Sequence, residues 1–306
     1  MSQPRRNDPL PFGGADGLPY SKGLMARALI AIGVPVVPAY DLARRVEEDL
    51  RGHGSATVEI ERLQELAVEV LGDREALRAI SRLRRYQQLR QLDLPVVVLI
   101  GGGTGTGKST VATEVAHRLG ITRVTSTDFV RQTMRAFFSP LFMPSVHYSS
   151  FEVGEALPAA EREAGDPLLL GFIDQTRNVL VGVQASIDRA LEEGWSIVLE
   201  GVHLVPGMLP PPIAPALVVH AVLAIDNEDV HAQNFSLRDA ALGGARPHDK
   251  YLDRLADIRH LQDFIVEEAE KTGVPVVQNG NIEAAIGAVM ELVLEQAEQL
   301  QRMEAR

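Results

Sequence analysis

The chain has 306 residues, 45% of them hydrophobic, which is enough for one large domain or two ordinary domains with a packed core. Its formal net charge of −11 at pH 7 argues against general binding to nucleic acids or to anionic membranes. The absence of cysteine excludes a disulfide framework and a thiolate metal site. Because the N-terminus has no apolar signal core and no apolar run could span a bilayer, we expect a cytoplasmic protein.

The first part of the chain is expected to be helical. Residues 1–18 are polar and rich in Gly and Pro, which predicts a flexible arm. Residues 21–90 then carry amphipathic segments whose apolar side chains recur with helical spacing. This pattern breaks near Gln91. We therefore expect one domain over 19–91 and a second domain over 92–306.

Short apolar segments alternate with amphipathic ones in the second domain. Continuous apolar runs such as Ile197-Val198-Leu199 are typical of strands in a parallel sheet that is covered on both faces. The expected strands are 95–100, 122–126, 196–200, 217–225 and 274–278. The expected helices are 108–119, 128–138, 171–193, 227–241, 248–272 and 282–302. The alternation predicts an α/β fold, with a doubly wound, mostly parallel, five-stranded sheet that binds phosphates at its carboxyl edge.

A glycine-rich segment lies between the first strand and the helix that follows it. It runs from Gly102 to Ser109 with the G-x-x-x-x-G-K-[ST] spacing of a phosphate-binding loop. Glycines let the backbone wrap around phosphate oxygens with N–H groups pointing inward, and the helix N-terminus adds a favourable dipole. Lys108 would reach the β- and γ-phosphates of ATP, and the Ser109 hydroxyl would bind Mg²⁺. The expected nucleotide-binding residues are Gly103, Thr104, Gly105, Thr106, Gly107, Lys108, Ser109 and Thr110.

Two alternatives to a phosphate-binding loop exist for this segment. A dinucleotide-binding loop needs the G-x-G-x-x-[GA] spacing, and its third position falls here on Thr106, Lys108 or Thr110. The sequence therefore disfavours that loop. A glycine-rich turn without phosphate binding is the other alternative.

Two carboxylates follow strands of the expected sheet. Glu200 ends an apolar strand, where a carboxylate would hold Mg²⁺ through water or orient the attacking group. Asp128 follows the preceding strand, where it could accept the proton of an acceptor hydroxyl or orient that hydroxyl. The alternatives are a surface carboxylate at Glu200 and an N-cap at Asp128. His203 follows Glu200 closely, and a structural role is the ordinary reading of such a histidine.

Candidate acceptor-binding groups lie on the helix after Asp128 and in the Pro-containing region beyond it. Arg131 and Arg135 are four residues apart, so they share one helix face and could clamp a carboxylate or phosphate. The alternative is a solvated basic face that pairs with nearby acids. The region 139–170 reads as a long functional loop. It offers polar groups for a small substrate at His147, Ser149 and Ser150.

A lid is expected after the fourth strand. Arg238 and Arg246 flank a Gly-containing loop, and arginines on such a segment can close over ATP and stabilise the charge of phosphoryl transfer. The alternative is an ordinary surface turn.

Several of these segments together resemble the 2-phosphoglycerate kinase family. The resemblance covers most of residues 18–295. It is carried by the segments Val96–Thr110, Ser126-Thr127-Asp128 with Arg131 and Arg135, His147-Tyr148-Ser149-Ser150, Arg246–Tyr251, Ile258-Arg259 and Gln262-Asp263. Residues 18–43 resemble that family's N-terminal extension, which looks like an ATP-cone, a helical nucleotide-sensing module. The extension here lacks a clear basic β-hairpin start, which leaves a helical docking domain as the alternative.

The resemblance implies a P-loop kinase that uses Mg-ATP to phosphorylate 2-phosphoglycerate to 2,3-bisphosphoglycerate. By motif position, Lys108 and Ser109 fall at the nucleotide and Mg²⁺ site, and Asp128 falls beside the acceptor. Arg131 and Arg135 also fall beside the acceptor, and Arg238 and Arg246 fall in the lid. We expect a small anionic phosphorylated substrate, no nucleic-acid or membrane partner, and leave a homo-oligomer open. The alternatives are a kinase for another phosphorylated polyol or sugar acid, such as an inositol phosphate, and a non-catalytic ATP-switched regulatory module.

Overall fold

The computed structural model describes residues 20–55, 57–163, 165–211, 214–241 and 248–304. They divide into two compact units. One unit contains the described residues up to Asp93, together with residues 117–120 and the C-terminal segment from Met290. The other contains residues 94–116 and the described part of 121–289. Among the described residues no helix is both long and apolar enough to cross a membrane.

The first unit is built on four helices near the N-terminus. These helices are α1 (Lys22–Ala31), α2 (Val36–His53), α3 (Ile60–Leu71) and α4 (Asp73–Gln91). The Ser21 side chain caps α1 by accepting a hydrogen bond from the Leu24 N–H at 3.4 Å. Leucines such as Leu29, Leu42 and Leu63 are fully buried between the helices and form the core of this bundle. The amphipathic pattern of the sequence therefore corresponds to packed helices.

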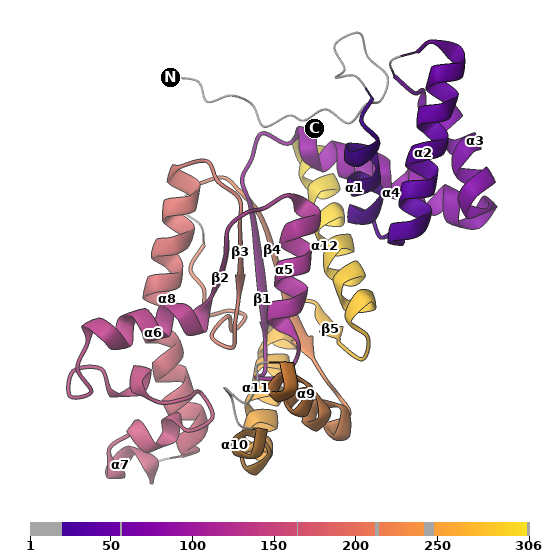
Figure 1. Ribbon diagram of the computed structural model, residues 1–306. Helices are drawn as coiled ribbons and strands as arrows, with labels where there is room; N and C mark the ends of the chain where they lie inside the picture. The colour runs from indigo at the N-terminus through magenta and orange to yellow at the C-terminus, as the bar shows by residue number, and fades with distance from the viewer. Residues whose placement is uncertain (1–19, 56, 164, 212–213, 242–247, 305–306) are drawn as a thin grey trace. The chain divides into compact units, whose positions relative to one another are not determined.

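The second unit is built on a five-stranded sheet in which every strand pairing is parallel (Figure 1). The strands are β1 (Val96–Gly102), β2 (Val124–Ser126), β3 (Ile197–Glu200), β4 (Leu217–Ala224) and β5 (Val276–Gln278). Their order is β2-β3-β1-β4-β5, so the chain moves to one side of β1 and then to the other. This arrangement confirms the predicted doubly wound parallel sheet. Ligands of such sheets bind at the carboxyl edge, where the strand order reverses.

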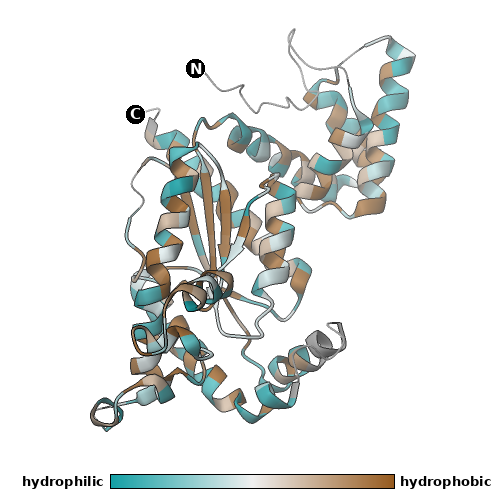
Figure 2. Cartoon of the chain, turned by 60° about the vertical axis from the view of Figure 1, so that its left-hand side comes forward, coloured by the Kyte–Doolittle hydropathy of each residue, from teal (hydrophilic) through white to brown (hydrophobic). Residues whose placement is uncertain are grey.

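Helices cover both faces of this sheet. The longer ones are α5 (Lys108–Leu119), α6 (Thr127–Phe137), α8 (Pro167–Glu192), α9 (Glu228–Ala241) and α11 (Leu255–Thr272). The last helix, α12 (Ile282–Glu304), begins in this unit, and its residues from Met290 belong to the first unit. The region 139–170, expected as a loop, contains the short helices η1 (Pro144–His147), η2 (Val153–Ala156) and α7 (Ala159–Arg162). Figure 2 shows the strands coloured as hydrophobic and the helices as two-sided, which fits a sheet buried between amphipathic helices.

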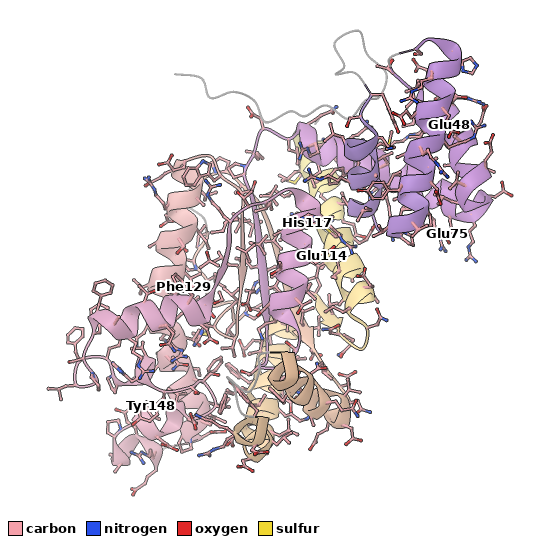
Figure 3. The ribbon with its side chains drawn as sticks, viewed as in Figure 1. Glu48, Glu75, Glu114, His117, Phe129 and Tyr148 are labelled. Atoms are coloured by element: carbon pink, nitrogen blue, oxygen red, sulfur yellow. The ribbon has the colours of Figure 1, made fainter. Side chains whose placement is uncertain are left out.

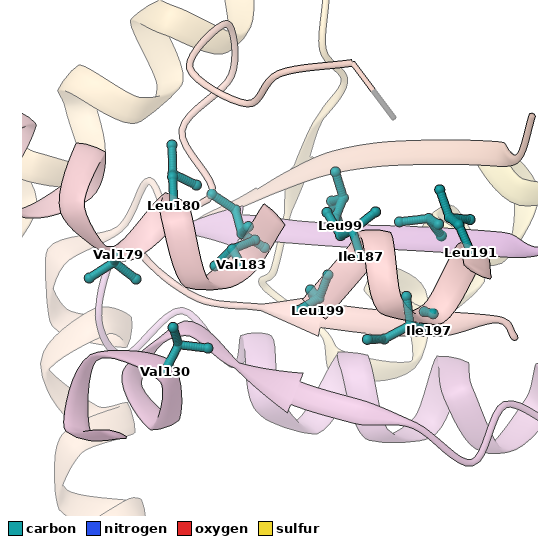
Figure 4. Packing of buried hydrophobic residues seen from close by; sticks show 12 residues of the cluster. Leu99, Val130, Val179, Leu180, Val183, Ile187, Leu191, Ile197 and Leu199 are labelled. Carbon is teal, nitrogen blue, oxygen red and sulfur yellow. The ribbon is translucent and has the colours of Figure 1, made fainter. Parts of the chain in front are cut away.

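The core between α8 and the sheet shows how the strand alternation positions the fold. Val97 and Leu99 of β1 and Ile197 and Leu199 of β3 point to the same face, where they pack against residues of α8 such as Ile187 (Figure 4). Each large aliphatic side chain buried in this way contributes about 1.5–3 kcal/mol to folding. This packing fixes the strands whose carboxyl ends carry the polar residues described below.

One helix that the sequence predicts as continuous is interrupted in the structure. The segment expected as a single helix over 248–272 consists of α10 (His248–Asp253) and α11, separated at Arg254. Arg254 has φ −112° and ψ 17°, outside helical geometry. Tyr251 of α10 stacks on Phe235 of α9, with ring centroids 5.0 Å apart. The segment therefore packs on α9 before α11 begins.

Candidate active site

The glycine-rich loop between β1 and α5 has a backbone that only glycine can adopt at two positions. Gly105 has φ +87°, and a Cβ there would lie 2.4 Å from the Phe235 ring. Gly107 has φ +83°, and a Cβ there would lie 2.5 Å from Nδ2 of Asn279. Both positions combine a left-handed backbone with close approach of a neighbouring side chain. The motif requires glycine at 107 but not at 105, and glycine at both positions lets the loop lie directly against Phe235 and Asn279.

Lys108 lies at the start of α5 and is buried. Its Nζ donates a hydrogen bond to the Gly103 carbonyl at 2.5 Å, and the Thr106 hydroxyl donates to the same carbonyl at 3.0 Å. Burial lowers the pKa of Lys108, while the nearby carboxylates of Glu200 and Asp128 oppose that shift. The lysine thus folds back over its own loop and brings a positive charge between the loop and two carboxylates.

The Ser109 hydroxyl and the Glu200 carboxylate face each other at the end of the sheet. Ser109 Oγ donates to Glu200 Oε1 at 3.0 Å, and Glu200 is buried. The register of the sheet produces this pairing, since Glu200 lies opposite Ile100 on one side and Ser126 on the other. A hydroxyl and a carboxylate are oxygen donors of the kind that Mg²⁺ prefers. The described residues hold no group of three or more His, Cys, Asp or Glu that could bind a metal ion.

Asp128 lies in the first turn of α6, and another residue caps that helix. The Ser126 hydroxyl accepts the Phe129 N–H at 3.0 Å and is the N-cap, so the alternative reading of Asp128 as the cap is wrong. The side chain of Asp128 is 59% exposed, and its charge acts on both Lys108 and His203. Asp128 therefore presents a solvent-accessible carboxylate beside the lysine of the loop.

Arg131 and Arg135 differ in their surroundings. Arg131 is buried, and its Nη1 donates to the carbonyls of Val146 at 3.1 Å and Tyr148 at 2.9 Å. Its Nε lies 3.4 Å from Oδ1 of Asp128. Arg135, one turn further along α6, is exposed. Arg131 thus ties α6 to the segment that contains η1. Figure 3 labels Phe129, on α6, and Tyr148, in that segment.

That segment also holds the three polar residues expected near the acceptor. His147 Nε2 donates to the Phe138 carbonyl at 2.9 Å. Ser150 is buried and Ser149 is half-buried. The structure places all three in the segment that Arg131 anchors.

A buried chain of hydrogen bonds runs from α6 to α8 through His203. Thr127 Oγ1 lies 2.8 Å from His203 Nδ1, and Gln175 Oε1 lies 3.0 Å from His203 Nε2. The Gln175 amide donates from Nε2 to the carbonyls of Ser145 at 2.6 Å and Tyr148 at 3.0 Å. Because the Gln175 oxygen must accept, His203 carries its proton on Nε2 and accepts the Thr127 hydroxyl at Nδ1.

His203 is therefore a neutral structural histidine. Burial lowers its pKa to about 4. Gln175 completes the chain, although nothing in the sequence singles it out, since it lies within the long helix α8 and its partners come from distant segments. The chain fixes the start of α6, and so the position of Asp128, against α8 and the η1 segment.

The two arginines expected in the lid are not fully described by the structure. Arg246 lies outside the described residues. Arg238 lies in α9, but its side chain is not among those described. Their expected role stays a prediction.

The sheet order, the glycine loop and the carboxylates at the strand ends define a P-loop kinase. No family model matches the chain. It is 33% identical over 278 residues to the 2-phosphoglycerate kinase of Methanopyrus kandleri, covering 90% of this chain and 84% of that protein. It is 32% identical over 285 residues to that of Pyrococcus furiosus, covering 93% and 92%, and 35% identical over 274 residues to that of Methanothermobacter thermautotrophicus, covering 89% of each. The chain belongs to the 2-phosphoglycerate kinase family.

Solved structures offer only remote likenesses. A gluconokinase from Sinorhizobium meliloti is 16% identical with a TM-score of 0.38, covering 69% of this chain and 98% of that one. A shikimate kinase from Acinetobacter baumannii is 14% identical with a TM-score of 0.35, covering 70% and 96%. These likenesses are too distant to support a statement about this chain.

Proposed function

We propose that this kinase transfers the γ-phosphoryl group of ATP to the free hydroxyl of 2-phosphoglycerate and forms 2,3-bisphosphoglycerate and ADP. The observation that carries the proposal is the assembly of Lys108, the Ser109–Glu200 pair and Asp128 at one sheet edge, in a chain of this family. In the reaction, a bond forms between the acceptor oxygen and the γ-phosphorus. The bond from that phosphorus to the β–γ bridging oxygen breaks, and the hydroxyl proton leaves.

The loop and the buried carboxylate fit the nucleotide and its metal ion. Lys108 and the loop N–H groups would bind the β- and γ-phosphates. Ser109 and Glu200 would hold Mg²⁺ through their side-chain oxygens, which are donors that suit this ion. When bound, Mg²⁺ would neutralise negative charge on the phosphates. The lysine leaves its contact with the Gly103 carbonyl when a phosphate oxygen takes that place.

Asp128 would orient the acceptor hydroxyl and accept its proton. Its exposed carboxylate lies beside Lys108, on the side of the site where α6 begins. Arg131 would bind the acceptor's anionic groups through Nη2, which makes no hydrogen bond within the described part of the chain, while Nη1 holds the guanidinium in place. Arg135, His147, Ser149 and Ser150 stay as further candidate contacts to the acceptor.

An assay of ADP release with Mg-ATP tests the acceptor. The panel contains 2-phosphoglycerate, 3-phosphoglycerate, glycerate and inositol phosphates. Release that depends on 2-phosphoglycerate and is much slower with the others supports the proposal. Release with another acceptor would replace the substrate and keep the mechanism, whereas tight ATP binding without any acceptor-dependent release would favour the regulatory-module alternative.

The proposal extends to the domains of the chain, the lid and the localisation of the protein. The flexible arm expected over residues 1–18 lies outside the described residues. Residues 19–91 would form an ATP-cone-like helical domain, and residues 92–306 would form the kinase domain. Arg238 and Arg246 would supply positive charge over the transferring group. We expect a cytoplasmic enzyme without a nucleic-acid partner, and homo-oligomer formation stays open.

A further inference from the structure

Three side chains from outside the glycine loop donate hydrogen bonds to three consecutive carbonyls of that loop. His231 Nε2 lies 2.7 Å from the Thr104 oxygen, and Asn234 Nδ2 lies 3.0 Å from the Gly105 oxygen. Asn279 Nδ2 lies 2.8 Å from the Thr106 oxygen. His231 and Asn234 are one turn apart on α9, and Asn279 follows β5 directly. The loop is therefore held by two elements that flank it in space and lie more than 100 residues away in sequence.

The planarity of the peptide bond gives these contacts a consequence for the opposite side of the loop. The described residues contain no cis peptide bond, so the carbonyl and the N–H of each peptide in the loop point in opposite directions. Fixing the carbonyls of Thr104, Gly105 and Thr106 toward α9 and β5 turns the N–H groups of Gly105, Thr106 and Gly107 away from them. Among the described residues, none of these three N–H groups donates a hydrogen bond to another group. Successive N–H groups that are left without an internal partner in such a loop can form an anion-binding concavity.

We propose that His231, Asn234 and Asn279 are positioning residues that hold the loop in its phosphate-binding conformation before the nucleotide arrives. This inference rests on the nucleotide half of the proposed function and deepens it. None of the three side chains has to touch the nucleotide for this role. They reduce the conformational freedom that the loop would otherwise lose on binding.

The burial of the contacts makes them effective. His231 is fully buried, with its ring stacked on Phe235 at a centroid distance of 5.5 Å and an interplanar angle of 21°. Asn279 is 8% exposed. The close approach of His231 and Phe235 to Gly105, and of Asn279 to Gly107, is possible because both positions lack a side chain. Loop and scaffold therefore form one preorganised unit.

The hydrogen-bond pattern also assigns His231 its chemical form. A carbonyl oxygen only accepts, so Nε2 carries the proton and the neutral ring has its lone pair on Nδ1. Nδ1 is buried without a hydrogen-bond partner within the described part of the chain. A second proton would create a buried N–H without an acceptor, close to the positive charges of Lys108 and Arg259. His231 thus acts as a hydrogen-bond donor and takes no part in moving protons.

The test uses two variants of His231, one that removes its hydrogen-bond donor and one that keeps a donor at the same position. His231→Leu removes the donor, while His231→Gln keeps an N–H that can reach the same carbonyl. We expect the Kd of ADP to rise about tenfold in His231→Leu and less than about threefold in His231→Gln. Tripolyphosphate with Mg²⁺ should lose affinity in parallel, because the effect acts on the phosphate site. The KM of the acceptor should change less than about twofold.

Matched controls separate positioning from general stability. His220 on β4 lies 3.3 Å from the Leu204 carbonyl with its Nε2, away from the loop, so His220→Leu removes a comparable bond and should leave ADP affinity unchanged. If His231→Leu does not fold, Asn234→Ala tests the same role at a half-buried residue. We expect this variant to weaken ADP binding about threefold.

The possible outcomes distinguish this inference from the proposed function. A wild-type chain that binds no ADP would overturn the proposed function itself. A folded His231→Leu or Asn234→Ala variant that binds ADP as tightly as the wild type would overturn the inference alone. Equal losses in His231→Gln and His231→Leu would also overturn it, because the lost donor would then not be the cause.

Discussion

At the scale of single residues, Lys108 carries a buried charge that depends on the groups around it. Its ammonium is buried beside two carboxylates, so its removal leaves Glu200 and Asp128 facing the phosphates without a positive charge between them. We expect Lys108→Ala to lower kcat/KM by roughly 100-fold or more while the fold is retained. Steady-state kinetics and thermal unfolding measure both effects. Lys271→Ala is the control, since that lysine pairs with Glu268 on the surface, and equal kinetics for the two variants would contradict the assignment.

The proposed role of Asp128 predicts that catalysis and nucleotide binding respond differently to its substitution. We expect Asp128→Asn to lower kcat by about 10²–10⁴-fold, because the amide cannot accept the proton of the acceptor hydroxyl. The Kd of ADP should change little, because the carboxylate lies beside Lys108 and not among the loop N–H groups. Calorimetric titration with ADP and single-turnover kinetics check the two parts. A loss of ADP affinity as large as the loss in kcat would instead move Asp128 to the metal site.

His203 predicts a pH dependence of stability. Its pKa in the folded chain is about 4, below the ordinary value of 6.5, so the unfolded chain binds the proton first as pH falls. The free energy of unfolding should therefore decrease between about pH 6.5 and pH 4, by up to roughly 3 kcal/mol from this group. Denaturant titrations across this range measure the slope. His220 acts in the same direction, so His203→Gln should lose only part of the slope, and an unchanged slope would contradict the account.

At the scale of elements, the packing of α8 on the sheet predicts a contrast within one helix. Ile187 is 5% exposed and contacts the sheet, whereas Val181 on the same helix is 69% exposed. Ile187→Ala should lower the free energy of unfolding by about 2–5 kcal/mol, because it leaves a cavity against β1 and β3. Val181→Ala should change it by less than about 0.5 kcal/mol. Chemical denaturation of both variants measures the difference, and similar losses would show that α8 does not pack as described.

The elements that the sequence predicts well are those specified by neighbouring residues. The expected helix over 108–119 coincides with α5, because the glycine motif fixes where it begins. Helix α8 starts at Pro167, four residues earlier than expected, since the Asp166 side chain caps it by accepting the N–H groups of Leu168 and Leu169. An Asp-Pro pair is a sequence signal for the start of a helix, but the expected start of this helix rested on the periodicity of apolar residues alone. The break at Arg254 depends on the stacking of Tyr251 on Phe235 and could not be read from local pattern.

The residues of the candidate site likewise divide into those that the sequence predicts and those that it does not. Lys108, Ser109, Glu200 and Asp128 each follow a strand or begin a helix, so their convergence follows from a parallel sheet. Gln175, His231 and Asn279 gave no signal, because their hydrogen-bond partners lie far away along the chain. Their types and spacing match no motif. Only the three-dimensional structure brings them to the buried chain through His203 and to the carbonyls of the glycine loop.

At the scale of the whole molecule, an acidic chain has to bind two anionic substrates. The net charge of −11 repels ATP and a phosphorylated acid at long range, so local positive charge and oriented N–H groups must attract them at the site. In the proposed mechanism, Lys108, Arg131 and the loop N–H groups would supply that attraction. The family gives the class of reaction, and the proposed mechanism assigns separate residues to the nucleotide and to the acceptor.

The identity of the product tests the central claim most directly. Phosphorus NMR of the purified chain with Mg-ATP and 2-phosphoglycerate follows both substrates and both products in one sample. The account predicts that the ATP signals are replaced by those of ADP while two phosphate-ester signals of 2,3-bisphosphoglycerate appear in equal amounts. Formation of inorganic phosphate with 2-phosphoglycerate unchanged, or persistence of both substrates, would contradict it.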